Sequence, residues 1–158
     1  MHHPPRKLRG TNNMGNETIG SIVRSKRDSV HFVAPTATVF EAIAMMAEKD
    51  IAAVLVMRAG TLLGIISAKD YGRKVVLKGR SSKDVLVQEI MTTPVFTTTL
   101  DRTVGGDLAV MTCESIRHLP VLADGETVGI VSMADLVKSL VSEQAFVIEE
   151  LRKYVGHQ

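Results

Sequence analysis

The chain has few cysteines, few aromatic residues and no long apolar run, and each shortage excludes a class of protein. Cys113 is the only cysteine among 158 residues, so no disulfide can form within the chain, which is typical of a reducing compartment. No run of about 18 apolar residues occurs, so no membrane-spanning helix is predicted. The N-terminal segment has charges but no apolar core of a secretory signal. These absences predict a cytoplasmic protein that does not enter a membrane.

Tryptophan is absent and aromatic residues make up only 4% of the chain, whereas apolar residues make up 45%, so the core must be aliphatic. The net charge is only +2, and much of the excess lies near the N-terminus. No basic stripe interleaved with aromatic residues is found, so nucleic-acid binding is not expected, although the basic start keeps it open as an alternative. Residues 1–17 are rich in Pro, Gly and Asn, which predicts a disordered tail.

The sequence matches itself without a gap when it is shifted by 65 positions, so that Asp70 falls on Asp135. The matched positions are Val30, Thr38, Val39, Ala44, Met46, Ile51, Val56, Gly60, Gly64, Ile65, Ser67 and Asp70. So many identities at one offset indicate an internal duplication.

Each repeat has the same pattern of predicted elements. A short extended piece (30–33; 95–99) precedes a helix that begins after Thr38 or Thr103. A strand (53–57; 119–122), a turn containing Gly60 or Gly125 and a returning strand (62–66; 128–131) follow, and a second helix begins at Ser67 or Ser132. The last helix is predicted to run from 133 to 155 and to stop at Gly156.

The predicted fold is therefore α/β (α+β), with two β-α-β-β-α repeats packed around a pseudo-two-fold axis. One repeat of this length cannot bury both faces of its sheet, so the two copies must pack together. The expected divisions are a first repeat at 18–79, a linker at 80–89, a second repeat at 90–142 and a C-terminal helical extension at 143–158.

The strongest motif is Gly-Ile-Ile-Ser-Ala-Lys-Asp at 64–70, which recurs as Gly-Ile-Val-Ser-Met-Ala-Asp at 129–135. One interpretation is purely structural, because Ser-x-x-Asp forms a capping box at the start of a helix. The other is functional. A helix N-terminus offers free N–H groups and favours an ionised Asp, whose carboxylate can accept bonds from two adjacent ribose hydroxyls.

Together with Ile-Met-Thr-x-x-Val (90–95), Asp-x-Thr-Val (101–104) and Ile-Arg-His-Leu-Pro-Val (116–121), these motifs resemble those of tandem CBS domains, also called a Bateman module. The resemblance covers about residues 20–142 and includes small bacterial proteins that consist of little else. It implies two clefts that bind adenosine derivatives: AMP, ADP, ATP, NAD(H) or, less expected, S-adenosylmethionine. It also implies a homodimer.

The resemblance places one aspartate and one serine in each cleft, Asp70 with Ser67 and Asp135 with Ser132. The residues implied beside them are Thr92 and Arg24 at the N-terminal position of each site, and Ile116 and Ala53 on the strands that line the base. It further implies that Arg117 and His118 reach the phosphate in the Asp70 cleft, which would then bind it more tightly. The Asp135 cleft would need charge from elsewhere, with Arg73 and Lys74 as candidates.

The expected function is a regulatory nucleotide-binding module that acts on an effector protein which the sequence does not identify. No catalytic residue or catalytic cofactor is predicted, because no nucleophile, metal-binding carboxylate cluster, Walker A motif or dinucleotide fingerprint is found. The alternative is a regulator that binds nucleic acid or a protein partner and takes no nucleotide ligand.

Overall fold

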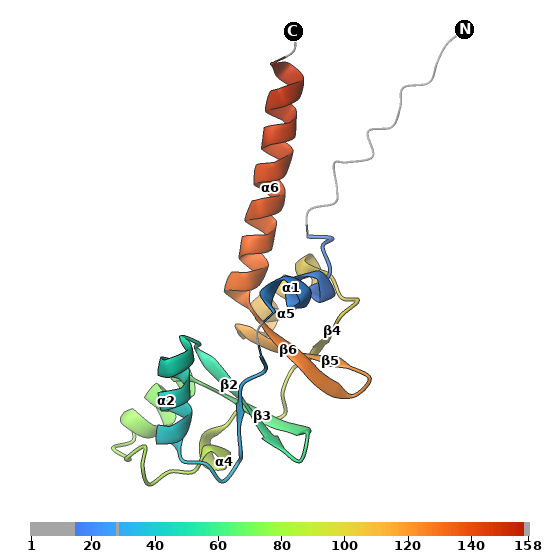
Figure 1. Cartoon of the computed structure of the whole chain (residues 1–158). Coiled ribbons are helices and arrows are strands. Elements are labelled where there is room, and N and C mark those ends of the chain that lie inside the picture. Colours follow the sequence, from blue (N-terminus) through green and yellow to red (C-terminus); the bar gives the residue numbers. More distant parts are fainter. Residues whose placement is uncertain (1–14, 28, 157–158) are drawn as a thin grey trace, which may run out of the picture.

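The computed structural model describes residues 15–27 and 29–156 (Figure 1). Its elements in chain order are α1 (Ile19–Lys26), β1 (Phe32–Val33), α2 (Val39–Lys49), β2 (Ala53–Arg58), β3 (Thr61–Ser67), α3 (Ala68–Tyr71), the π-helical segment η1 (Gly72–Val76), α4 (Val87–Ile90), β4 (Thr98–Thr99), α5 (Val104–Glu114), β5 (His118–Ala123), β6 (Glu126–Ser132) and α6 (Met133–Val155). The mixed α+β architecture confirms the predicted fold class.

The two repeats form two three-stranded sheets of the same topology, β1-β2-β3 and β4-β5-β6. In each sheet the first strand is parallel to the second, and the second pairs with the third in an antiparallel hairpin. Val33 pairs with Val56 as Thr98 pairs with Val121. Each hairpin also shifts register directly after these partners, at Val56 and at Val121. The structure therefore confirms the duplication down to single residue pairs.

The turns and helix starts follow the predicted local chemistry. Both hairpin turns need positive φ at two successive residues, at Ala59-Gly60 and at Asp124-Gly125, which suits the twist of the flanking strands. Thr38 caps α2, accepting from the amide of Glu41, while the Glu41 side chain accepts from the amide of Thr38. These local signals fix where strands reverse and helices begin.

Two helices that the sequence analysis missed are exchanged between the repeats. The α1 helix precedes the first repeat in the chain but packs on the second sheet, where Ile19 and Ile22 join the core with Leu119 and Val131. Conversely, the segment before the second repeat packs on the first sheet, with Val85, Val87 and Ile90 buried there. Residues 80–89 are thus part of the first core rather than a plain linker, because their apolar side chains need burial.

The prediction that residues 1–17 are disordered is wrong for residues 15–17. Residues 1–14 lie outside the described residues. Gly15 is buried, its carbonyl accepts from the Gly105 amide at 2.9 Å, and its own amide donates to Glu143 at 3.2 Å. A side chain on Gly15 would collide with the Gly105 main chain, so both glycines permit this close approach. Residues 15–17 are therefore held against α5 and α6.

The second core contains a buried carboxylate that the first lacks. Asp107 accepts from the Thr98 hydroxyl and from Arg102 Nε, the latter at 2.9 Å, and its side chain is only 2% exposed. The corresponding positions of the first repeat hold Val33, Ala37 and Ala42. The two repeats thus differ in core chemistry while they share one backbone plan.

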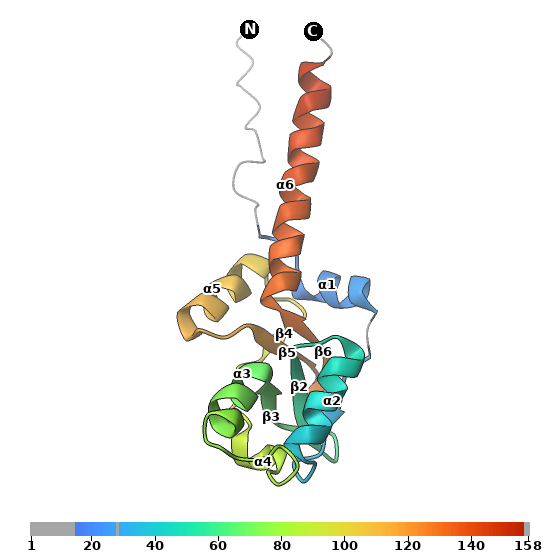
Figure 2. The same ribbon diagram turned by 90° about the vertical axis from the view of Figure 1, so that its left-hand side faces the viewer.

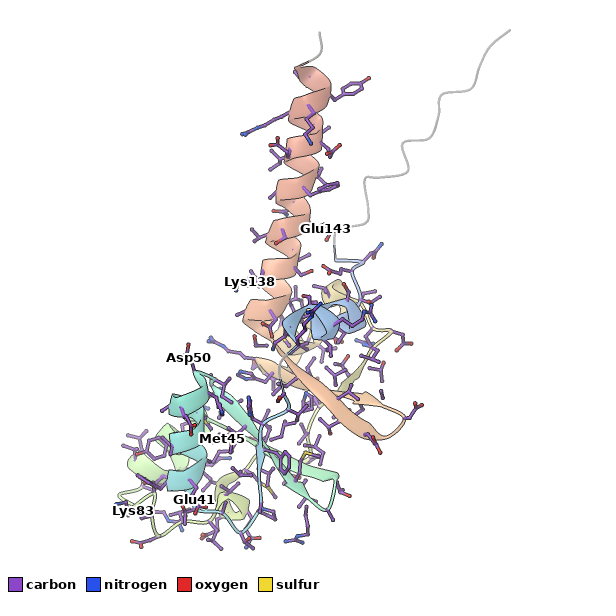
Figure 3. All side chains as sticks on the ribbon, in the orientation of Figure 1. Glu41, Met45, Asp50, Lys83, Lys138 and Glu143 are labelled. Carbon is purple, nitrogen blue, oxygen red and sulfur yellow. The ribbon has the colours of Figure 1, made fainter. Side chains whose placement is uncertain are left out.

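The predicted C-terminal helix is observed with its expected limits, Met133 to Val155, and Gly156 follows it. Its first turns pack on α5, and Leu136 is buried there. The rest extends well beyond the two sheets (Figures 1 and 2), and its side chains point outward along the whole projecting part (Figure 3). Among the described residues, no helix is long and apolar enough to cross a membrane.

Candidate functional site

Asp135 lies in the first turn of α6, where β6 ends. The Ser132 hydroxyl accepts from the Asp135 amide at 3.1 Å, and Asp135 Oδ2 accepts from the Ser132 amide at 2.8 Å. This reciprocal pair is the capping box that the structural interpretation of the motif predicts. The cap also fixes the carboxylate at the mouth of a cleft, so the structural and functional interpretations are compatible.

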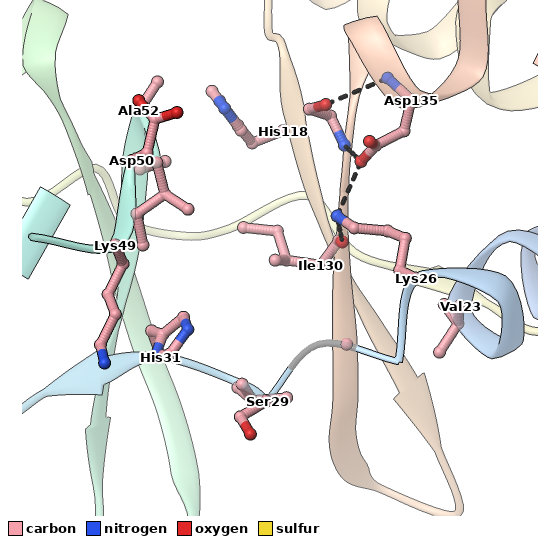
Figure 4. Close-up of a pocket in the computed structure, with 15 residues that line it drawn as sticks. Val23, Lys26, Ser29, His31, Lys49, Asp50, Ala52, His118, Ile130 and Asp135 are labelled. Carbon is pink, nitrogen blue, oxygen red and sulfur yellow. Dashed lines mark hydrogen bonds and ion pairs between the residues drawn. The ribbon is translucent and has the colours of Figure 1, made fainter. Parts of the chain in front are cut away.

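Lys26 supplies the positive charge next to Asp135. Its Nζ lies 2.8 Å from Asp135 Oδ2 and donates to the Ile130 carbonyl at 3.1 Å (Figure 4). Burial by itself raises the pKa of Asp135, but the hydrogen bonds from Lys26 and Ser132 and the ammonium charge outweigh it and lower the pKa. Asp135 is therefore an ionised acceptor at neutral pH.

A cleft of about 350 Å³ opens between the two sheets beside this ion pair. Its ionisable lining residues are Lys26, His31, Lys49, Asp50, His118 and Asp135. Apolar walls come from Val23, Val30, Ile51, Ala52, Ala53 and Ile130. Figure 4 shows Lys26 and Asp135 on one side of the cleft and Lys49 and Asp50 on the other. The volume is within the range of small-molecule sites, which join apolar walls with a few polar groups.

His118 lies in the Asp135 cleft, so its predicted place in the Asp70 cleft is wrong. It is the first residue of β5 and pairs with Ser132 of β6, which brings it next to Asp135. Burial lowers the pKa of His118, Asp135 opposes that effect, and Lys26 and Arg117 add to it. His118 is thus largely neutral at pH 7. The side chain of Arg117 is exposed, and its carbonyl accepts from the amide of Met133.

Asp70 is held in the same way as Asp135, with different neighbours. Ser67 forms the capping box, and Asp70 Oδ2 accepts from its amide at 3.0 Å. Thr92 donates to Asp70 Oδ1 at 3.2 Å, so the structure places it beside this carboxylate as predicted. Lys74, suggested above for the Asp135 cleft, instead lies 3.1 Å from Asp70 and donates to the Ile90 carbonyl at 2.8 Å. The reason is helical spacing, since residues four apart share one face.

The remaining candidates are divided between cleft, core and surface. Ala53 lines the Asp135 cleft, as predicted. Ile116 packs on the core of the second repeat, and Arg73 is exposed. Arg24 is exposed on α1, beside Gly20, and Lys26 occupies the position next to the carboxylate instead. No local sequence signal marked Lys26, Lys49, His31 or Asp50, because the cleft forms between the two repeats, and Lys26 reaches it through the packing of α1 on the second sheet.

Metal ligation finds no support in the part of the chain that the structure describes, since no three His, Cys, Asp or Glu side chains are grouped there as a metal site would require. The cleft instead pairs two ammonium groups, Lys26 and Lys49, with two carboxylates, Asp50 and Asp135. This composition suits an anionic ligand with hydroxyl groups.

Comparison with known proteins agrees with the repeats and their fold. Residues 19–74 and 87–142 each match the CBS domain. The chain is 33% identical over 147 residues to the CBS domain-containing protein CBSX3, mitochondrial, of Arabidopsis thaliana, covering 87% of this chain and 71% of that protein. It is 25% identical over 127 residues to the CBS domain-containing protein YhcV of Bacillus subtilis, covering 80% and 90%.

Solved structures give the same result. A protein with CBS domains from Burkholderia ambifaria MC40-6 superposes with a TM-score of 0.78 at 41% identity, covering 80% of this chain and 96% of that one. The CBS-domain containing protein ATU1752 from Agrobacterium tumefaciens gives 0.74 at 30% identity, covering 77% and 98%. The duplicated sequence, the paired sheets and these matches together show that the chain belongs to the CBS domain family and carries two CBS domains in tandem.

Proposed function

We propose that this CBS pair is a regulatory module that binds an adenosine-containing nucleotide in the Asp135 cleft and passes the signal to an effector protein. CBS pairs are in general regulatory and bind ligands, and the choice of AMP, ADP, ATP or NAD(H) is our proposal. The observation that carries it is the convergence of Asp135, Lys26 and His118 on one cleft of about 350 Å³.

Each part of a nucleotide has a matching group in this cleft. The Asp135 carboxylate can accept bonds from two ribose hydroxyls. Lys26, Lys49 and His118 can face a phosphate. The side chains of Ile51, Ala53 and Ile130 offer apolar walls for a base. S-adenosylmethionine has no phosphate for Lys26 and Lys49 to face, so it fits the cleft less well.

The preferred cleft for the phosphate is therefore revised. The sequence analysis favoured the Asp70 cleft because Arg117 and His118 were expected there, but His118 lines the Asp135 cleft. Asp70 has Lys74 and Thr92 as its polar partners. We propose that the Asp135 cleft binds the anionic ligand more tightly and that the Asp70 cleft is the weaker or second site.

We also propose that the chain forms a homodimer through α6. One face of α6 carries a stripe of six residues, five of them apolar, at alternating spacings of four and three. These residues are Val137, Val141, Gln144, Ile148, Leu151 and Val155. Heptad position a is then occupied by Val141, Ile148 and Val155, and position d by Leu151. β-Branched residues at a and leucine at d favour a parallel coiled coil of two helices. The five apolar members are exposed in the single chain. A second copy has the same repeat, so its helix fits this stripe along its length.

A binding role rather than a catalytic one is part of this proposal, as is a location in the cytoplasm. The central carboxylates act as helix caps and ion-pair partners, a state that suits ligand binding.

Nucleic-acid binding through the basic N-terminus stays the alternative, and most of that segment lies outside the described residues. A steep loss of nucleic-acid affinity with salt would favour the alternative.

The test is calorimetric titration of the full chain with AMP, ATP, NAD⁺, NADH and S-adenosylmethionine. Asp135→Asn and Asp70→Asn serve as matched variants, since each keeps the size of the side chain and removes its charge. We expect an adenine nucleotide to bind the wild type and Asp135→Asn to weaken the tighter site by about tenfold or more. If none of the five compounds binds to the folded wild type, the proposal is wrong.

A further inference from the structure

The Asp135 carboxylate is already occupied in the ligand-free fold, and the residue that occupies it comes from the other end of the chain. Lys26 is the last residue of α1, and its ammonium bridges Asp135 Oδ2 and the Ile130 carbonyl. The two side chains are 26% and 22% exposed, so solvent screens this ion pair only partly. A ribose that binds Asp135 must compete with this ammonium.

The two clefts differ in the origin of this cation. In the Asp70 cleft it is Lys74, four residues along the same helical segment. The equivalent position of the second repeat is Ser139, which donates instead to Glu17. The second repeat therefore has no lysine at the position equivalent to Lys74, and the cation that pairs with Asp135 is Lys26 of α1.

We propose that Lys26 is a specificity-determining residue that keeps Asp135 paired until a ligand brings an anionic group for the ammonium. A neutral nucleoside separates the ion pair and offers the ammonium no equivalent partner. A nucleotide gives the carboxylate its ribose hydroxyls and the ammonium its phosphate, so both charges stay paired. The Asp135 cleft thus selects phosphorylated adenosine compounds over adenosine. This inference rests on the function proposed above.

The position of Lys26 also connects the ligand to the path of the chain. Directly after it, Arg27 adopts a left-handed conformation, and the chain then leads to Val30 and His31 on the wall of the same cleft. If the ammonium moves from Asp135 towards a phosphate, the end of α1 and the residues that follow it, up to His31, move with it. The cation that selects the ligand is therefore attached to the segment that runs from α1, packed on the second sheet, to β1 of the first sheet.

The test compares AMP with adenosine, which differ only in the phosphate, by calorimetry in an Asp70→Asn background that isolates the Asp135 cleft. In the Asp70→Asn variant with no second substitution, we expect AMP to bind at least about tenfold more tightly than adenosine. Lys26→Met should reduce that ratio about tenfold or more, with adenosine binding more tightly and AMP more weakly. Lys26→Arg keeps the charge and should retain most of the selectivity.

Lys153→Met, which breaks the exposed ion pair with Glu150 on α6, is the matched control in the same Asp70→Asn background and should leave the selectivity of the Asp135 cleft unchanged. Thermal unfolding of every variant verifies that each is folded. If AMP binds but the AMP-to-adenosine ratio is the same in Lys26→Met, the role of Lys26 is overturned while the proposed function stands. If neither compound binds to any folded protein, including the wild type, the proposed function itself is overturned.

Discussion

At the scale of single residues, the Ser-x-x-Asp motif has two roles at once. Asp135 caps α6 through the Ser132 amide and also presents a carboxylate to the cleft. The sequence allowed both interpretations to be predicted, because capping depends only on local spacing. It did not allow the partners Lys26 and His118 to be predicted, because Lys26 is 109 positions from Asp135 in the chain and His118 is brought to it by the pairing of β5 with β6.

The titration of His118 gives a prediction at this scale. Because burial lowers its pKa below the usual 6.5, the free protein holds His118 neutral at pH 7. A phosphate beside it, together with Asp135, should raise that pKa against the effects of Lys26 and Arg117. Nucleotide binding should then take up a proton, and AMP affinity should rise by up to about tenfold per pH unit as the pH falls between the two pKa values.

Calorimetry in buffers of different ionisation enthalpy measures this proton uptake. His118→Gln is the control, because the phosphate of AMP titrates equally with both proteins and cancels in the comparison. Equal proton uptake by the wild type and by His118→Gln would show that His118 does not face the phosphate. The free protein should also lose stability as the pH falls below about 6.5, since unfolded His118 binds its proton first.

At the scale of elements, the strands, hairpin turns and capped helices could be predicted, whereas α1 and α4 could not. The predicted elements carry strong local signals, such as Asp124-Gly125 in a turn and Thr38 with Glu41 at a helix start. The α1 and α4 helices are short, with eight and four residues. They are stabilised by burial on the sheet of the opposite repeat, which is a tertiary effect.

The C-terminal helix gives a prediction at the scale of elements. If α6 pairs with a second copy, Ile148→Asp places a charge at the centre of the stripe and should convert the dimer to a monomer at micromolar concentration. Light scattering after size-exclusion chromatography measures the mass. Phe146→Asp is the matched control, since Phe146 is also exposed but lies off the stripe. A wild-type chain that is monomeric at all concentrations would contradict the pairing.

The buried carboxylate of the second repeat gives another prediction. Arg102→Met leaves Asp107 buried beside Thr98 without its cation, which should lower the free energy of unfolding by about 1–3 kcal/mol. Adding Asp107→Ala and Thr98→Val makes all three positions apolar, as they are in the first repeat, and should recover most of that loss. Chemical denaturation of the single and triple variants measures both effects. A triple variant no more stable than Arg102→Met would show that the ion pair is not the cause.

At the scale of the whole molecule, the exchange of segments builds both sites. Because α1 packs on the second sheet, Lys26 reaches Asp135, and because the chain before the second repeat packs on the first sheet, Ile90 and Thr92 reach the Asp70 site. Duplication and fold class follow from the sequence, since identities at one offset need no structure. The composition of each cleft does not, because it depends on which repeat receives each connecting segment.

The most direct test of the nucleotide site is a crystal structure of the full chain grown with AMP. We predict density for the nucleotide in the Asp135 cleft, with the ribose hydroxyls on the Asp135 carboxylate and the phosphate facing Lys26 and His118. A complex in which AMP is bound elsewhere, while Lys26 remains paired with Asp135 in an empty cleft, would contradict the account.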